Sequence, residues 1–384
     1  MRRNLFISIF ITVFFSVFTG INYYIGWNGW IYFSTVFKTI QANPILYWSL
    51  FWIVAYSYVL GRMGRHFYDL WIFRALMWIG AYWMGAMIYL ILLLPIANVV
   101  EIFISSLVDS REESVRWMGT AVLTILGVIM IWGSRNAWSP VARRYEIHLH
   151  KRHGNTPSEP IRIIVASDFH LGTIVGRRHL QRWVKRVNAF QPDLVLLPGD
   201  LVDDDIRPFV KNRMDEIFRE IRSRWGIIAI TGNHDPFKDV NQGFMQAMEN
   251  AGIKMLLDEH MQIADRLIVV GREERSVRGG WPNSRKPLSQ LMESLDQNLP
   301  ILVMDHQPLG FAEAAALGAD IMLSGHTHRG QLAPGHLITR RIFDLDYGYR
   351  QFGNMHAIVS SGYGTWGPPL RIGSRCEYIE LILT

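Results

Sequence analysis

Five short segments between residues 167 and 328 of this 384-residue chain carry Asp, Asn and His side chains that could hold metal ions. They are Ser167-Asp168-Phe169-His170, Gly199-Asp200-Leu201-Val202-Asp203, Gly232-Asn233-His234-Asp235, Asp305-His306 and Gly325-His326-Thr327-His328. Hard oxygen ligands combined with imidazole suit Mn, Fe or Zn in roughly octahedral sites. The lone Cys376 excludes a disulfide framework and a zinc-thiolate site. The segments therefore predict a metal centre without sulfur ligands.

Short apolar runs in front of these segments indicate an α/β fold. We predict strands at 161–166, 194–197, 227–230, 267–270, 301–304 and 321–323, with two more near 356–359 and 378–383. Segments long enough for helices lie at about 177–190, 208–223 and 240–250. In an open α/β sheet, the loops beyond the carboxyl ends of the strands converge on one crevice. Residues as distant in sequence as Asp168 and His328 can therefore meet.

The first 150 residues differ from the rest in composition and indicate a membrane domain. They hold ten of the 14 Trp residues and 11 Lys and Arg against 6 Asp and Glu, whereas the remainder holds 28 against 27. Trp is enriched where membrane spans meet water. A nucleic-acid-binding domain would carry its basic surplus on its folded surface, so the nearly neutral second half predicts no nucleic-acid partner.

Four segments without Lys, Arg, Asp or Glu are candidate membrane spans. They lie at about 5–25, 45–60, 75–100 and 118–133, and a bilayer core about 30 Å thick needs roughly 20 helical residues. No small-residue cleavage site follows the first run, which argues against a signal peptide. The aromatic segment 27–42 could be an interfacial helix or part of a hairpin. One span more or fewer would reverse the side of the second half.

The distribution of basic residues predicts which side of the membrane the second half occupies. Lys and Arg number 2, 1, 3, 2 and 5 in the successive segments outside the four spans. Cytoplasmic loops retain these residues, so both ends of the membrane domain are expected in the cytoplasm. We predict a multi-pass membrane domain at 1–150, a polar linker with two Pro at 151–160, and a cytoplasmic α/β domain at 161–384.

The order D-x-H, G-D-x-x-D, G-N-H-D, H, G-H-x-H resembles the calcineurin-like metallophosphoesterase superfamily over residues 161–384. The tail Gly362-Tyr363-Gly364-Thr365-Trp366-Gly367-Pro368-Pro369, followed by Arg371-Ile372-Gly373, looks like a bacterial branch that joins this domain to membrane spans. Some members of that branch act on lipid-linked diphosphates. The resemblance implies a two-sheet α/β/β/α sandwich and a location in the bacterial inner membrane.

The resemblance also implies a role for each candidate residue. Two divalent metal ions, Mn first with Fe or Zn as alternatives, would activate a bridging hydroxide and neutralise phosphoryl charge. His234 would protonate the leaving oxygen, and Asp203 would orient its imidazole. Asp204 occupies a position where related protein phosphatases carry Arg, which argues against a protein phosphatase. The implied ligands are Asp168, His170 and His328 for one metal, Asn233, His306 and His326 for the other, and Asp200 as the bridge.

These expectations lead to one main hypothesis and two alternatives. The main hypothesis is a membrane-anchored phosphoesterase that cleaves phosphoester or phosphoanhydride bonds in a lipid-linked substrate, such as a phospholipid or a UDP-diacylglucosamine-like lipid. Anchoring motivates the lipid, because it confines enzyme and substrate to one surface. The alternatives are a phosphodiesterase or phosphatase for a soluble nucleotide, and a non-catalytic metal-binding sensor. The oligomeric state stays open.

Overall fold

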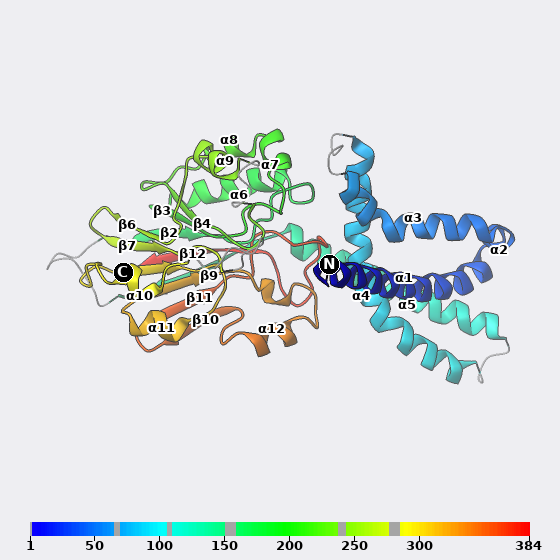
Figure 1. The fold of residues 1–384 in the computed structure, drawn as a ribbon. Helices are drawn as coiled ribbons and strands as arrows, with labels where there is room; N and C mark the ends of the chain where they lie inside the picture. The colour runs from blue at the N-terminus through cyan, green and yellow to red at the C-terminus, as the bar shows by residue number, and fades with distance from the viewer. Residues whose placement is uncertain (1, 65–69, 106–109, 150–158, 237–242, 276–284) are drawn as a thin grey trace. The chain divides into compact units, whose positions relative to one another are not determined.

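The computed structural model describes the chain except residues 1, 65–69, 106–109, 150–158, 237–242 and 276–284 (Figure 1). Two compact units make up the described chain. The first contains residues 1–133 and 367–369, and the second contains residues 134–366 and 370–384. Most of the linker predicted at 151–160 lies outside the described residues.

The first unit is built from helices. They are α1 (Arg2–Val36), α2 (Lys38–Ala42), α3 (Pro44–Met63), α4 (Trp71–Ile104) and α5 (Arg111–Trp138), whose last residues belong to the second unit. Helices α1, α3, α4 and α5 are long and apolar enough to cross a membrane, which confirms the four predicted candidate spans. The ambiguous segment 27–42 continues α1 to Val36 and then forms the short α2.

Close helix packing in the first unit depends on small residues and on one buried amide. A Cβ on Gly80 of α4 would collide with the backbone of Tyr58 in α3. The side chain of Asn22 is fully buried, and its Oδ1 accepts a hydrogen bond of 2.9 Å from Trp83 Nε1. Its amide nitrogen donates to Phe18 O at 2.9 Å. The buried amide is therefore hydrogen-bonded on both sides, as an apolar environment requires.

Two six-stranded sheets form the centre of the second unit. The first has the order β1 (Val141–Ile147), β12 (Glu377–Leu383), β2 (Ile161–Val165), β3 (Leu194–Pro198), β4 (Ile227–Ile230), β5 (Ile253–Met255). The second has the order β10 (Gly348–Phe352), β11 (Met355–Val359), β9 (Ile321–Ser324), β8 (Ile301–Met304), β7 (Leu267–Gly271), β6 (Glu259–Ile263). Strands β2 to β5 are parallel to one another, as are β7, β8, β9 and β11.

Side-chain alternation along the strands produces four layers. Ile163 and Val165 of β2 point into the core between the two sheets, whereas Ile164 packs against the helices of the outer layer. The helices over the first sheet are α6 (Arg177–Phe190), α7 (Arg207–Lys211), α8 (Met214–Phe218) and α9 (Phe244–Asn250), and those over the second include α10 (Leu288–Met292) and α11 (Phe311–Ala316) (Figure 1). This arrangement confirms the α/β/β/α sandwich.

The structure adds elements that the apolar pattern did not indicate. Strand β1 lies within residues 1–150, which we assigned to the membrane domain, and pairs with β12 in the second unit. Its sequence, VARRYEI, is polar because it forms the edge of the sheet. Strands β5, β6 and β10 were not predicted either. The helix predicted at 208–223 is two short helices, because Arg213 between them has a left-handed φ of 50°.

Candidate metal centre

All seven residues expected as metal ligands lie in loops directly after parallel strands. These loops follow β2, β3 and β4 of the first sheet and β8 and β9 of the second. Both sheets contribute because the ends of their strands face the same side of the sandwich. The ligand candidates after these strands are, in order, Asp168 and His170, then Asp200, then Asn233, then His306, then His326 and His328.

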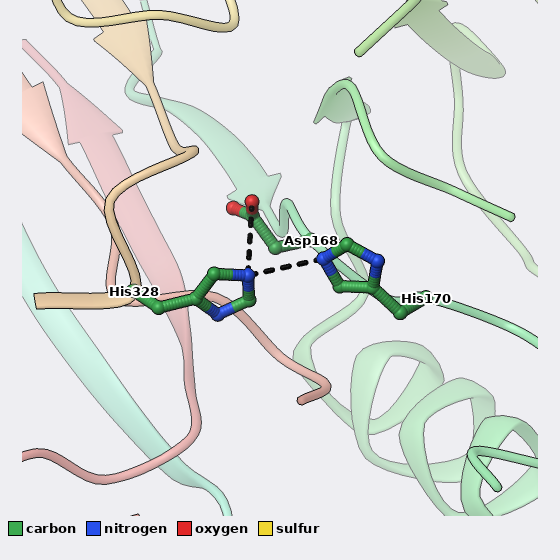
Figure 2. Close-up of side chains that lie close together, drawn as sticks. All are labelled: Asp168, His170 and His328. Atoms are coloured by element: carbon green, nitrogen blue, oxygen red, sulfur yellow. Dashed lines mark hydrogen bonds and ion pairs between the residues drawn. The ribbon is translucent and has the colours of Figure 1, made fainter. Parts of the chain in front are cut away.

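Asp168, His170 and His328 form the first group of ligand atoms (Figure 2). The Nε2 atoms of His170 and His328 lie 3.0 Å apart, and His328 Nε2 lies 3.6 Å from Asp168 Oδ1. The three side chains are buried, and their ligand atoms lie within 4.8 Å of one another. Two imidazoles and a carboxylate that converge in this way can hold one divalent cation.

Asn233, His306 and His326 form the second group. Asn233 Oδ1 lies 3.2 Å from His306 Nε2 and 2.9 Å from His326 Nδ1. Asp200 lies between the two groups, because its Oδ2 is 3.3 Å from His306 Nε2 and 3.6 Å from His170 Nε2. The geometry therefore provides two neighbouring ligand sets with Asp200 facing both, and Asp168 of the first set also lies within 4.8 Å of ligand atoms of Asp200 and His306.

The backbone at this site adopts conformations that most side chains avoid. Five of the seven candidate ligands have a positive φ: Asp168, His170, Asp200, His326 and His328, at 48° to 71°. Such strain costs of order 1–3 kcal/mol per residue and concentrates at functional sites. Gly199 has a φ of 84°, and a Cβ there would lie 2.6 Å from His306 Nδ1. The strand-end turns thus bring the ligand side chains together at a cost in local stability.

Hydrogen bonds from outside the ligand set fix the ligand side chains. His306 Nδ1 lies 2.8 Å from Pro198 O, so it can donate to that carbonyl and leave Nε2 for a metal. His326 N donates to both carboxylate oxygens of Asp168 at 2.9 and 3.1 Å. Arg371 is fully buried, and its guanidinium reaches His328 O at 2.8 Å and His328 Nδ1 at 2.7 Å. Arg371 lies in the tail segment Arg371-Ile372-Gly373, and no spacing rule predicts its contact with His328.

The electrostatics of the pocket favour positive charge overall and neutral imidazoles at His170 and His328. Burial lowers the pKa of His170 to about 3, and burial together with Arg371 holds the pKa of His328 well below its usual value. Burial acts in the same direction on His306, but the facing carboxylates of Asp200 and Asp168 raise its pKa well above the ordinary value. The pocket thus attracts a cation. Its oxygen and imidazole donors fit two divalent metal ions.

His234 lies beside this cluster with its carboxylate partner behind it. The rings of His234 and His170 have centroids 5.1 Å apart, and His234 Nδ1 lies 3.0 Å from Asp204 Oδ1. Burial opposes protonation, but the hydrogen bond to Asp204 and the charge of Asp200 raise the pKa of His234 above its ordinary value. A raised pKa keeps a proton on the ring near neutral pH, which suits a general acid.

The carboxylate that lies 3.0 Å from His234 Nδ1 is that of Asp204, the neighbour of the Asp203 that we expected to orient the ring. Asp204 has a left-handed φ of 60°, and its backbone N donates to His234 O at 3.0 Å. This backbone contact brings the Asp204 side chain to the His234 ring. Asp203 Oδ1 lies 3.8 Å from His170 Nδ1, and an Asp203 carboxylate oxygen also lies within 4.8 Å of a His234 ring nitrogen. The sequence offers Asp203, Asp204 and Asp205 in a row, and no spacing rule distinguishes them.

The chain is similar in sequence to known proteins over the α/β domain. The family described as calcineurin-like phosphoesterase matches residues 161–330. A metallophosphoesterase from Aquifex aeolicus, described as uncharacterized, is 32% identical over 216 residues, which cover 55% of this chain and 80% of that protein. Among solved structures, a dimetal phosphatase from Danio rerio is 12% identical, covers 53% of this chain and 87% of its own, and has a TM-score of 0.34.

Relatives that combine this domain with membrane segments also match. Two proteins named "Transmembrane protein with metallophosphoesterase domain", from Danio rerio and Bos taurus, are 29% and 28% identical over 68% and 73% of this chain. The chain spans 61% and 65% of their lengths. The chain therefore belongs to the calcineurin-like metallophosphoesterases. Its four apolar helices and these relatives support a membrane protein.

Proposed function

We propose that this protein is a membrane-anchored, dinuclear-metal phosphoesterase that acts on a lipid-linked substrate. The observation that carries the proposal is the pair of ligand sets that share Asp200, whose Oδ2 lies within 3.6 Å of imidazole nitrogens from both sets. When bound, two divalent metal ions would lower the pKa of water and neutralise charge on the phosphoryl oxygens. Mn is our first choice, with Fe or Zn as alternatives.

The residues of the chain would then divide the remaining work. Asp168, His170 and His328 would hold one ion, and Asn233, His306 and His326 the other, with Asp200 between them. During hydrolysis, a water oxygen bonds to phosphorus while the bond from phosphorus to the leaving oxygen breaks. His234 would deliver a proton to that leaving oxygen. Asp204 would hold the ring and stabilise its charged form, because its carboxylate lies 3.0 Å from Nδ1.

The first unit supports a lipid as the substrate. Its helices line an open apolar pocket of about 410 Å³, to which Ile25, Leu50, Leu94 and Val122 contribute. All four candidate spans contribute to this lining. Hydrocarbon is the solvent around membrane helices, so an acyl chain is the natural occupant. Contact between this protein and membrane lipids is therefore part of the proposal.

The membrane location that we propose is the bacterial inner membrane with the second unit in the cytoplasm. Four candidate spans, an even number, return the chain to the side from which it started. The first, third and fifth segments outside the spans together carry ten basic residues, whereas the second and fourth together carry three. This asymmetry supports the cytoplasmic side for both ends of the membrane unit.

Lipid mass spectrometry tests the substrate class directly. Native membrane lipids would be incubated in detergent with the full-length protein and Mn²⁺, with Asp200→Asn as the matched control. We expect a phosphate-containing lipid to disappear only with the wild-type protein, and its products to identify the bond that breaks. If the two proteins leave identical lipid profiles, the lipid substrate is wrong, and a soluble phosphodiester becomes the next substrate to test.

A further inference from the structure

Trp366 is an exposed aromatic residue beside the proposed general acid. Its side chain is 53% exposed, and its ring centroid lies 5.4 Å from that of His234 at an angle of 42°. The His234 side chain itself is only 10% exposed. One part of the indole thus packs near the acid while the rest faces solvent. A large aromatic surface left open at a reaction centre is a candidate contact for substrate.

The loop that carries Trp366 is held by reciprocal hydrogen bonds. Trp366 N donates to Gln331 Oε1 at 3.0 Å, and Gln331 Nε2 donates to Trp366 O at 2.8 Å. Gln331 is only 9% exposed and follows the ligand His328 by three residues. The backbone of Trp366 is therefore fixed to the same turn that supplies a metal ligand. An exposed indole with a fixed backbone gives a binding surface at low entropic cost.

The position of the indole relative to His234 defines which part of a substrate it would meet. Because Asp204 occupies Nδ1, only Nε2 of His234 can deliver a proton to the leaving oxygen. The group attached to that oxygen must leave on the His234 side of phosphorus. The exposed ring next to His234 is that of Trp366. An apolar group bonded to the leaving oxygen would cover its exposed face.

We propose that Trp366 forms a leaving-group subsite that selects phosphoesters whose leaving oxygen carries an apolar group. The proposal rests on the proposed function, because it requires His234 to act on the leaving oxygen. It narrows that function, since small polar leaving groups would gain nothing from the indole. Both an acylated glycerol and an aromatic alcohol have the required chemistry, and the experiment separates them.

Methylphosphonate monoesters test the subsite because each has only one ester bond that can be cleaved. The three leaving groups would be dihexanoylglyceryl, p-nitrophenyl and trifluoroethyl. Full-length, Mn-loaded wild-type protein would be compared with Trp366→Ala, Trp366→Phe and the control Tyr349→Ala, which removes an exposed aromatic residue of β10. Release of methylphosphonate gives kcat and KM for each ester, and metal content and Tm verify that each variant is folded.

We expect Trp366→Ala to raise KM about five- to tenfold for an ester with an apolar leaving group, in line with a lost aromatic contact. KM for the trifluoroethyl ester should stay within about twofold, because that leaving group is too small to cover the indole, and Trp366→Phe should restore most of the loss. A rise for only one of the apolar esters identifies the acyl or the aromatic source. An equal loss on all three esters would assign Trp366 to membrane attachment or folding and overturn the subsite. Cleavage of no ester by the wild type would instead overturn the proposed function itself.

Discussion

Replacement of Asp204 by Asn should slow catalysis without removing metal. The carboxylate lies 3.0 Å from His234 Nδ1, and it raises the pKa of that imidazole. Loss of a carboxylate that orients a functional His commonly costs 10- to 100-fold, which corresponds to about 1.4–2.8 kcal/mol in the activation free energy. We therefore expect kcat to fall by roughly 10- to 100-fold in Asp204→Asn, with both metal ions retained.

Asp203→Asn is the matched comparison, because Asp204 lies 3.0 Å from His234 Nδ1, whereas the adjacent Asp203 lies near both His234 and His170. Asp203 lies 3.8 Å from Nδ1 of the candidate ligand His170. Its loss should weaken metal retention more than it lowers kcat at saturating Mn²⁺. Metal content by plasma mass spectrometry and kcat on a phosphodiester would be measured for both variants. The opposite pattern, with full metal content and a larger kcat loss in Asp203→Asn, would refute the assignment of Asp204.

The pH profile provides a second readout for the same pair. A general acid must be protonated, so kcat falls as pH rises through the pKa of His234. Asp204 raises that pKa, and its removal should move the alkaline fall in kcat to lower pH. Asp203→Asn should move this limb less. An alkaline limb that stays in place in Asp204→Asn would exclude His234 as the titrating acid.

Two further predictions concern stability and the backbone of the site. Burial, helped by Arg182, lowers the pKa of His179 to about 4 from 6.5. Unfolding therefore takes up a proton between these pH values. The free energy of unfolding of the wild type should fall as the pH is lowered through this range, by up to about 1.4 kcal/mol per pH unit. His179→Gln should flatten the pH dependence of Tm, and a pH dependence equal to that of the wild type would contradict this prediction. Gly199→Ala should lower metal content and Tm, because the new Cβ would collide with His306 and because Gly199 has a φ of 84°. Gly176→Ala should change neither, because the space around its Cβ is open. Equal behaviour of the two variants would contradict the packing argument.

The sequence predicted the central sheet because its strands are apolar and the candidate ligands follow them directly. Ile227–Ile230 is buried at every position and was placed correctly as β4. Asp168 and His328 could be expected to meet because parallel strands direct their carboxyl ends to one edge. The same reasoning failed for β1, whose polar sequence becomes a strand only by pairing with β12, some 230 residues later.

Details within the site depend on contacts that single-sequence patterns do not encode. Three consecutive aspartates follow β3, and the left-handed turn at Asp204 selects the one that reaches His234. The support of His328 by Arg371 joins residues 43 positions apart and follows from no spacing rule. Trp366 was part of a recognised tail, but its place beside His234 required the three-dimensional fold.

The most direct test of the dinuclear hydrolase is metal content and turnover measured on the same full-length samples. Wild-type protein and Asp200→Asn would be loaded with Mn²⁺, freed of excess metal, and assayed with a generic phosphodiester. We predict two metal ions per wild-type chain with turnover that a chelator abolishes and Mn²⁺ restores. Asp200→Asn should lose metal and turnover together, because its carboxylate faces both ligand sets. Near wild-type turnover in Asp200→Asn would contradict the shared-carboxylate centre.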